Sequence, residues 1–320
     1  MQQILIIQTA FLGDVILATP VVEKLRKFYP DAKIDFLLRK GNESLLLGHP
    51  HLRKVYVWNK QENKWGNLFS ILKEIRAKEY DVVINLQRFF SSGFFTAFSK
   101  GKQKVGFDKN PLSFFYTQKY PHQIGIEKSS SHEVDRNLSL INSFTDNSTE
   151  KPRLYPSKAD FEKIKTDKNY VCIAPASVWF TKQLPAAKWI ELINKIDSKT
   201  SVFLLGAPND KSLCKQIKTQ STHPKIEIKA GTLNLLQSAA LMQNAVMNYV
   251  NDSAPLHLAS AMNAPVTAFF CSTVPEFGFT PLSDNAIIKQ TKQKLDCRPC
   301  NLHGYKACPK GHFKCANIEV

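Results

Sequence analysis

Four short segments of the chain hold the side chains that could do chemistry. In the first, residues 9–20, Gly13 and Asp14 stand between a predicted strand over residues 4–8 and a predicted helix. Gly13 permits an unusual backbone angle or a close approach, and the positive end of a helix favours an ionised carboxylate. Asp14 is therefore a candidate base for a hydroxyl proton. Spacing alone favours the simpler role of a helix cap.

The second segment, residues 174–185, again lies between a predicted strand and a predicted helix. Ser177 and Thr181 supply hydroxyl groups and Lys182 supplies a positive charge, which together with loop amides can hold a diphosphate. A solvated surface lysine is the equal alternative. The glycine patterns of P-loop NTPases and of dinucleotide-binding oxidoreductases are absent from the sequence, so neither class is expected.

The third segment, residues 250–261, predicts a helix that begins at Asp252 or Ser253 and has Pro255 in its first turn. The amides at that end would point at an anion. His257 lies within the helix, where a core or supporting role is the simpler interpretation of a lone histidine.

The fourth segment is a cysteine cluster near the C-terminus. Four of the seven cysteines fall within nineteen residues, near His303 and His312: Cys297, Cys300, Cys308 and Cys315. This clustering suggests zinc, although the second pair lacks the spacing of a zinc ribbon. Free thiols packed under the first domain and disulfides are the alternatives. An odd number of cysteines fits a reducing compartment.

Short apolar runs alternate with amphipathic segments, which predicts parallel β-α-β units. The polar, turn-rich residues 145–156 interrupt this alternation and predict a linker. We therefore expect an N-terminal domain over residues 1–150, a C-terminal domain over 151–296 and a cysteine-rich tail over 297–320. The predicted elements include helices over residues 15–28, 131–144 and 186–197, and strands over 80–85, 170–174 and 265–270.

Residues 86–130 show little periodicity but contain phenylalanine-rich runs, which begin after Arg88. Phenylalanine is usually buried, so we favour core packing beneath a loop. The functional alternative is an acceptor cleft with aromatic walls and basic rims.

The composition and charge of the chain limit both its structural class and the kinds of partner that it can bind. The 320 residues are 43% hydrophobic and 22% charged, which excludes a fibrous or disordered chain. With 43 Lys and Arg against 27 Asp and Glu, the net charge of +16 predicts a polyanionic partner, such as nucleic acid, an anionic membrane or an acidic glycolipid. The sequence has neither a signal peptide nor an apolar run of membrane-spanning length, so we expect a cytoplasmic protein.

Together, the four segments resemble glycosyltransferase family 9, the lipopolysaccharide heptosyltransferases. Residues 13–20 resemble the family's G-D-x-x-x-x-x-P pattern, and residues 181–185 resemble its K-x-W-P segment with Leu184 in place of tryptophan. Residues 251–259 are similar to its D-[ST]-G-x-x-H-L-A-A segment with Ala254 in place of glycine. The cysteine-rich tail resembles that of some members.

This resemblance implies an α/β fold of the GT-B type, with two Rossmann-like, doubly wound domains facing across a cleft. The first domain would bind the acceptor and the second an ADP-sugar. The reaction would be an inverting, metal-independent transfer of a heptose-type sugar to a lipopolysaccharide core or related glycan. No cofactor is required; zinc in the tail stays an uncommitted option.

The resemblance also implies residue roles. Asp14 would be the general base, with Gly13 and Arg88 in the acceptor-side loop, and Lys182 would stabilise the departing diphosphate. The remaining predicted donor-binding residues are Ser177, Thr181, Asp210, Asp252, Ser253 and His257. Asp210 is shorter than the family's usual glutamate near the ribose.

Two other functions stay open. A basic nucleic-acid- or membrane-associated binding protein without transferase activity would explain the charge, but the basic residues are spread along the chain without a dense tract. An inactive assembly partner would explain Leu184 and Ala254. If the chain is such a transferase, we expect no nucleic-acid partner. We then expect it to bind peripherally to the inner face of the inner membrane, with its basic residues gathered around the cleft or on one membrane-facing side.

Overall fold

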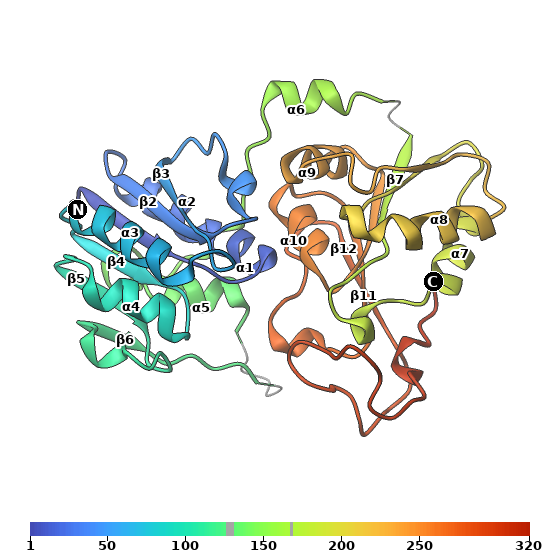
Figure 1. The fold of residues 1–320 in the computed structure, drawn as a ribbon. Coiled ribbons are helices and arrows are strands. Elements are labelled where there is room, and N and C mark those ends of the chain that lie inside the picture. Colours follow the sequence, from blue (N-terminus) through green and yellow to red (C-terminus); the bar gives the residue numbers. More distant parts are fainter. Residues whose placement is uncertain (126–130, 167–168) are drawn as a thin grey trace. The chain divides into compact units, whose positions relative to one another are not determined.

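The computed structural model describes residues 1–125, 131–166 and 169–320 (Figure 1). Its contacts divide the chain into two compact units. The first consists of residues 1–124 and 131–155, and the second consists of residues 156–320 together with Gly125. The unit boundary thus lies five residues beyond the predicted one at 150, and the cysteine-rich tail belongs to the second unit.

The first unit is built on a six-stranded parallel sheet. Its strand order is β3-β2-β1-β4-β5-β6, and the central strand β1 is almost entirely apolar and buried, as expected when helices cover both faces. The strands are β1 (Gln3–Ile7), β2 (Lys33–Arg39), β3 (Leu52–Trp58), β4 (Val82–Asn85), β5 (Gln103–Phe107) and β6 (Gln118–Tyr120).

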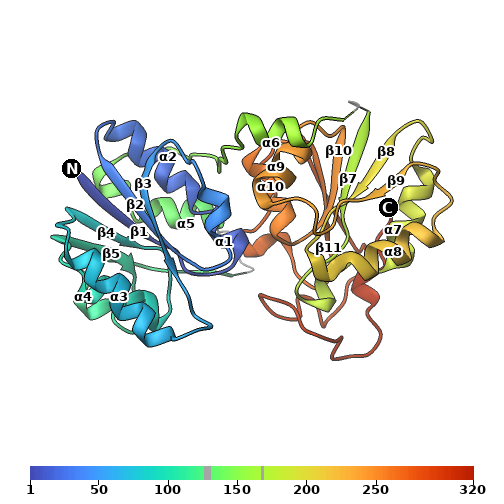
Figure 2. The same cartoon turned by 45° about the horizontal axis from the view of Figure 1, so that its top comes forward.

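Helices cover both faces of this sheet. In Figure 2, α2 and α5 lie on one face and α3 and α4 on the other. The α3 side encloses a core that includes Trp58, Leu68 and Phe95. The helices are α1 (Leu12–Ile16), α2 (Thr19–Phe28), α3 (Lys64–Arg76), α4 (Phe90–Phe98) and α5 (Glu133–Ser139), with 3-10 turns η1 (Glu43–Leu46), η2 (Ser113–Phe115) and η3 (Asn142–Phe144).

The second unit repeats this plan. Its parallel strands follow the order β12-β11-β10-β7-β8-β9, which is the same arrangement when strands are numbered within the unit. This is the doubly wound order of Rossmann-like domains. The strands are β7 (Tyr170–Ala174), β8 (Ser201–Leu204), β9 (Ile226–Ile228), β10 (Met247–Asn251), β11 (Val266–Phe270) and β12 (Ala286–Gln290).

The helices of the second unit again lie on both faces, with α7 and α8 opposite α9 and α10 (Figure 2). The core beneath α7 and α8 includes Trp189 and also Cys315 and Ile318 of the tail. The helices are α6 (Lys158–Lys163), α7 (Ala186–Lys195), α8 (Lys211–Gln220), α9 (Leu235–Gln243) and α10 (Ala254–Ala261), with 3-10 turns η4 (Phe180–Lys182), η5 (Pro208–Asp210), η6 (Pro275–Phe277) and η7 (Lys314–Ala316).

Three sequence predictions need correction. The helix expected over residues 15–28 is two helices, because α2 restarts at Thr19 with Pro20 in its first turn. The helix expected over 131–144 is α5 followed by the separate turn η3. The region 86–125 contains α4, β5 and β6, which its weak periodicity did not predict; residues 126–130 lie outside the described residues.

No helix among the described residues is both long and apolar enough to cross a membrane.

Candidate functional site

The predicted reactive residues follow the strands where each sheet reverses its order. In the first unit this switch point lies between β1 and β4, and in the second between β7 and β10. Ligands of doubly wound sheets bind beyond the carboxyl ends of the strands at such points. Asp14 follows β1 and Arg88 follows β4, while Lys182 follows β7 and Asp252 follows β10.

An ion pair joins the two loops at the switch point of the second unit. Lys182 Nζ lies 2.7 Å from Asp252 Oδ2, and both side chains are largely buried. The Thr273 hydroxyl, which follows β11, donates to the same Asp252 oxygen over 2.6 Å. Three neighbouring strands therefore contribute to holding one ammonium group at the carboxyl edge of the sheet.

The side chain of Asn251 holds the loop that carries Lys182 in place. The Asn251 side chain accepts from the amide of Leu184 at 2.9 Å and donates to the carbonyl of Pro175 at 2.9 Å. Leu184 itself is buried in the core, so the residue that replaces the family's tryptophan keeps an apolar anchor here.

Thr181 supports this loop instead of facing a ligand. Its side chain is fully buried, and its hydroxyl accepts from the amide of Tyr305 at 2.8 Å and from the hydroxyl of Ser272 at 3.0 Å. The Thr181 hydroxyl is therefore occupied by contacts within the protein and does not face a donor as predicted. Sequence reasoning missed this because Tyr305 lies 124 residues away.

Arg298 of the tail braces the same region. Its guanidinium donates to the carbonyls of Cys271 at 2.7 Å, Thr273 at 2.7 Å and Phe270 at 3.1 Å. These carbonyls belong to the end of β11 and the loop that holds Asp252. The tail is thus a structural part of the candidate donor site.

The other predicted donor residues are spread along this edge. Ser253 is the N-cap residue of α10, as predicted, and His257 is buried one turn further on. Ser177 is half-buried in the loop after β7. Asp210 follows β8, where its Oδ2 accepts from the amide of Ala207 at 2.7 Å.

Asp14 sits in the short helix α1, where its Oδ2 accepts from the amide of Phe11 at 3.0 Å. The predicted capping role is therefore real. Since α1 has only five residues, its dipole is weaker than that of the long helix predicted here. Gly13 has ordinary helical backbone within α1, so the unusual angle expected for it is absent.

Two charged residues of α5 join the Asp14 region. Glu133 and Arg136 form a buried ion pair of 2.8 Å. Burial raises the pKa of Glu133 to about 7; the Arg136 charge opposes this shift, the Asp14 carboxylate adds to it and Arg88 opposes it. The structure thus brings Asp14 and Arg88 together around a carboxyl group that the sequence analysis did not single out. The available signal was a pair of opposite charges three residues apart, which is the spacing at which side chains meet on a helix.

Two further cations border the loop that leads to Asp14. Lys60 Nζ donates to the carbonyl of Thr9 at 2.8 Å, and burial, together with the charges of Arg39 and Lys64, lowers the pKa of Lys60 to about 8. The guanidinium of Arg39 lies 4.7 Å from the ring of Phe11. This edge of the first sheet therefore carries several cations near the loop of Asp14.

The model of glycosyltransferase family 9 (heptosyltransferase) matches residues 68–306 of the chain. The chain belongs to this family. It is therefore a glycosyltransferase. Among its relatives, lipopolysaccharide heptosyltransferase 3 of Escherichia coli K12 is 29% identical over 300 residues, covering 86% of this chain and 84% of that protein. Lipopolysaccharide heptosyltransferase 1 of Campylobacter coli is 27% identical and covers 99% and 95%.

Solved structures agree with the fold. The family 9 glycosyltransferase of Veillonella parvula superposes with a TM-score of 0.80 at 22% identity, over 90% of this chain and 85% of that one. ADP-heptose lipopolysaccharide heptosyltransferase II of Escherichia coli gives a TM-score of 0.77 at 20% identity, over 94% and 96%. The predicted α/β fold of the GT-B type is confirmed.

In the tail of this family 9 enzyme, Cys297, Cys300 and Cys308 are half-buried and Cys315 is buried. Cys297 Sγ lies 3.8 Å from His312 Nε2, while Cys300 Sγ donates to the carbonyl of Cys297 and Cys315 is buried in the core. Within the described part of the chain, no group of three or more His, Cys, Asp or Glu residues could hold a metal ion. All seven cysteines are free thiols in this structure.

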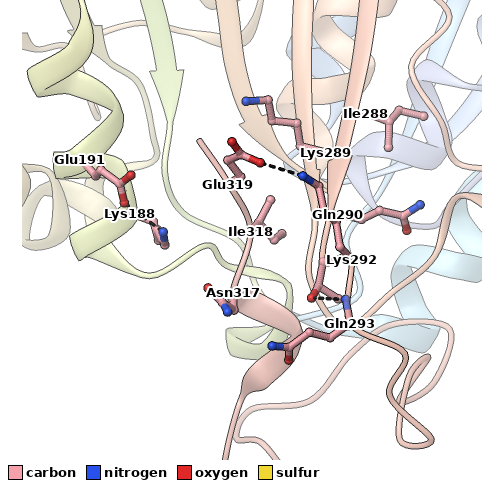
Figure 3. A pocket seen from close by; sticks show the side chains of 11 residues that line it. Lys188, Glu191, Ile288, Lys289, Gln290, Lys292, Gln293, Asn317, Ile318 and Glu319 are labelled. Atoms are coloured by element: carbon pink, nitrogen blue, oxygen red, sulfur yellow. Dashed lines mark hydrogen bonds and ion pairs between the residues drawn. The ribbon is translucent and has the colours of Figure 1, made fainter.

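The second unit also has a hollow of about 550 Å³, whose lining is separate from the predicted site residues (Figure 3). Its wall is formed by α7, β12 and the C-terminal segment, and it includes the ion pairs Lys188–Glu191 and Lys292–Glu319. It contains none of the predicted site residues, so we do not assign the donor to it.

The buried carboxyl of Glu133 gives the enzyme a pH-dependent stability. Its pKa rises from 4.5 to about 7 on folding, so the folded state holds a proton that the unfolded state releases. Stability should therefore fall as pH rises from about 4.5 to about 7 and then level off. We expect Glu133→Gln to remove this loss, so that the free energy of unfolding of the wild type declines relative to the variant by about 1–3 kcal/mol across that range. Urea unfolding at pH 5 and pH 8 measures it.

The exposed Glu162→Gln on α6 is the matched control, because water solvates its carboxylate in both states. A wild-type-to-variant difference at Glu133 that stays constant between the two pH values would show that this carboxyl is already ionised at pH 5.

Proposed function

We propose that this enzyme transfers a heptose-type sugar from an ADP-sugar to the core of a lipopolysaccharide, with inversion at the anomeric carbon and without a divalent metal. The relatives that carry this substrate class in their names are lipopolysaccharide heptosyltransferases, and a fold relative was solved with ADP. The observation that carries the proposal is the Lys182–Asp252 ion pair at the switch point of the second sheet.

On the donor side, the diphosphate would bind beyond β7 and β10, against Lys182 and the amides that begin α10. As the glycosidic bond breaks, negative charge grows on the departing diphosphate. An ammonium group already held in place stabilises that charge without reorganisation. Asp252 and Thr273 act by positioning Lys182, since both meet at one carboxylate oxygen.

On the acceptor side, Asp14 would take the proton of the attacking hydroxyl. The hydroxyl oxygen forms the new bond to the anomeric carbon, while the electron pair of the old bond leaves with ADP. One displacement of this kind inverts the configuration and needs no second carboxylate nucleophile. The cations Arg39, Lys60 and Arg88 at this edge match an acidic, phosphorylated acceptor.

The same charge suggests where the reaction occurs. We place the enzyme in the cytoplasm, peripherally bound to the inner face of the inner membrane, because an anionic surface attracts a protein with a net charge of +16.

A nucleotide comparison tests the donor class directly. We expect ADP to raise the melting temperature of the enzyme more than UDP or GDP does, because a ligand that binds only the folded state stabilises it. We also expect transfer from ADP-heptose to a deacylated, water-soluble core acceptor to survive chelation with EDTA. A preference for UDP would redirect the donor assignment, and loss of turnover that Mg²⁺ restores would overturn the metal-independent step.

A further inference from the structure

Six phenylalanines form a continuous strip on the first unit, which we call the aromatic strip. Successive ring centroids lie between 4.4 and 6.3 Å apart. The six rings come from α3, α4 and η2, and α4 contacts both other elements; Figure 2 shows α3 and α4 side by side on one face of the sheet. Its members are Phe69, Phe90, Phe94, Phe98, Phe114 and Phe115.

The aromatic strip faces solvent. Phe90, Phe94 and Phe98 recur every four residues, so they share the outer face of α4, whereas Phe95 points into the core. Phe69 is 56% exposed and Phe114 is 69% exposed. The core packing favoured for the phenylalanine runs is therefore wrong for Phe90, Phe114 and Phe115, whereas Phe94 is half-buried and packs against the core. Contiguous exposed aromatic surface of this kind marks an interaction site.

Cations border the aromatic strip. Lys73 and Arg76 follow Phe69 on α3 at helical spacing, and Arg76 Nη1 donates to the carbonyl of Phe98 at 2.6 Å. Lys104 Nζ donates to the carbonyl of Ala97 at 2.6 Å. Across residues 64–120, ten Lys and Arg stand against four Asp and Glu. Trp65 is also exposed, one turn before Phe69.

The basic border of the aromatic strip disfavours a second copy of the chain as the partner. A self-complementary contact over the strip would bring Arg76 and its neighbouring lysines of both copies together, and like charges at an interface oppose association. An anionic lipid leaflet offers the complement instead. Its headgroups pair with the cations, and aromatic rings settle at the boundary with the acyl chains.

We propose that the aromatic strip and its basic border form the surface by which this enzyme binds an anionic lipid membrane. This inference rests on the proposed function, which includes peripheral binding to the inner membrane. It adds the surface of the protein that makes the contact. It assigns the first unit, and in particular α3, α4 and η2, as the membrane-facing elements.

Vesicle co-sedimentation with the full chain tests the proposal. We expect binding to vesicles of phosphatidylethanolamine and phosphatidylglycerol and much weaker binding to phosphatidylcholine alone. The triple variant Phe69→Ser, Phe90→Ser, Phe114→Ser should bind the anionic vesicles at least about tenfold more weakly. The matched control Leu47→Ser, Val246→Ser, Ile287→Ser removes exposed apolar side chains elsewhere and should bind like the wild type.

Two further measurements separate the outcomes. Transfer to the water-soluble acceptor should be the same for the triple variant and the wild type, which shows that the variant is folded and that loss of vesicle binding is not loss of catalysis. Undiminished vesicle binding by the triple variant would overturn the proposal. The proposal would also be overturned if the wild type were a dimer in solution and the triple variant a monomer, since the aromatic strip would then join two copies of the chain.

Discussion

Asp14→Asn should lower the turnover number by about 10²–10⁴-fold while ADP still raises the melting temperature as in the wild type. An amide oxygen can still accept from the amide of Phe11, so the cap of α1 is retained. The amide cannot take up the proton of an acceptor hydroxyl. Turnover with saturating ADP-heptose and the water-soluble acceptor measures the effect.

Asp160→Asn provides the control for the structural role. Asp160 occupies the same position of its helix cap in α6 as Asp14 does in α1. We expect this variant to keep normal turnover with a small change in stability. If Asp14→Asn turned over normally, Asp14 would be a cap alone, and the base would have to be sought elsewhere on the carboxyl edge of the first sheet.

Lys182→Met should lower the turnover number by about 10²–10³-fold at saturating donor, because the departing diphosphate loses its fixed positive charge. The substitution also leaves the buried Asp252 carboxylate without its partner, which should cost about 3–5 kcal/mol of stability. The double variant Lys182→Met, Asp252→Asn removes that unpaired charge. It should recover much of the stability but none of the turnover.

This divergence separates catalysis from folding. Lys188→Met is the control, since Lys188 also pairs with a carboxylate, Glu191, but lies on α7 away from the switch point. We expect it to retain wild-type turnover. Recovery of both stability and turnover in the Lys182 and Asp252 double variant would show that Lys182 only holds the loop in place.

The sequence predicted the scaffold best where strands are buried on both faces. The predicted strand over 170–174 is the observed β7, because five consecutive buried residues give an uninterrupted apolar signal. The edge strand β12 was missed, since Ala286–Gln290 is mostly exposed and carries polar residues. Likewise α4 was missed because its outer face is aromatic, so its apolar residues do not form a single stripe.

Local pattern also placed the main candidate residues. Asp14, Lys182 and Asp252 each follow a predicted strand, and their family was identified correctly from those segments. Their partners could not be predicted in the same way. Glu133 lies 119 residues beyond Asp14 in the chain, and the burial that shifts its pKa exists only after α5 has packed.

The guanidinium of Arg298 limits where the second unit of this enzyme can be divided when a chimera is made with a relative. A chimera joined at residue 296 would pair the β11 loop of one parent with the tail of another, and three carbonyls depend on a residue beyond that junction. The amide of Tyr305, which fixes Thr181, would be exchanged as well. A chimera should therefore exchange residues 156–320 together, so that the β11 loop and the tail come from the same parent.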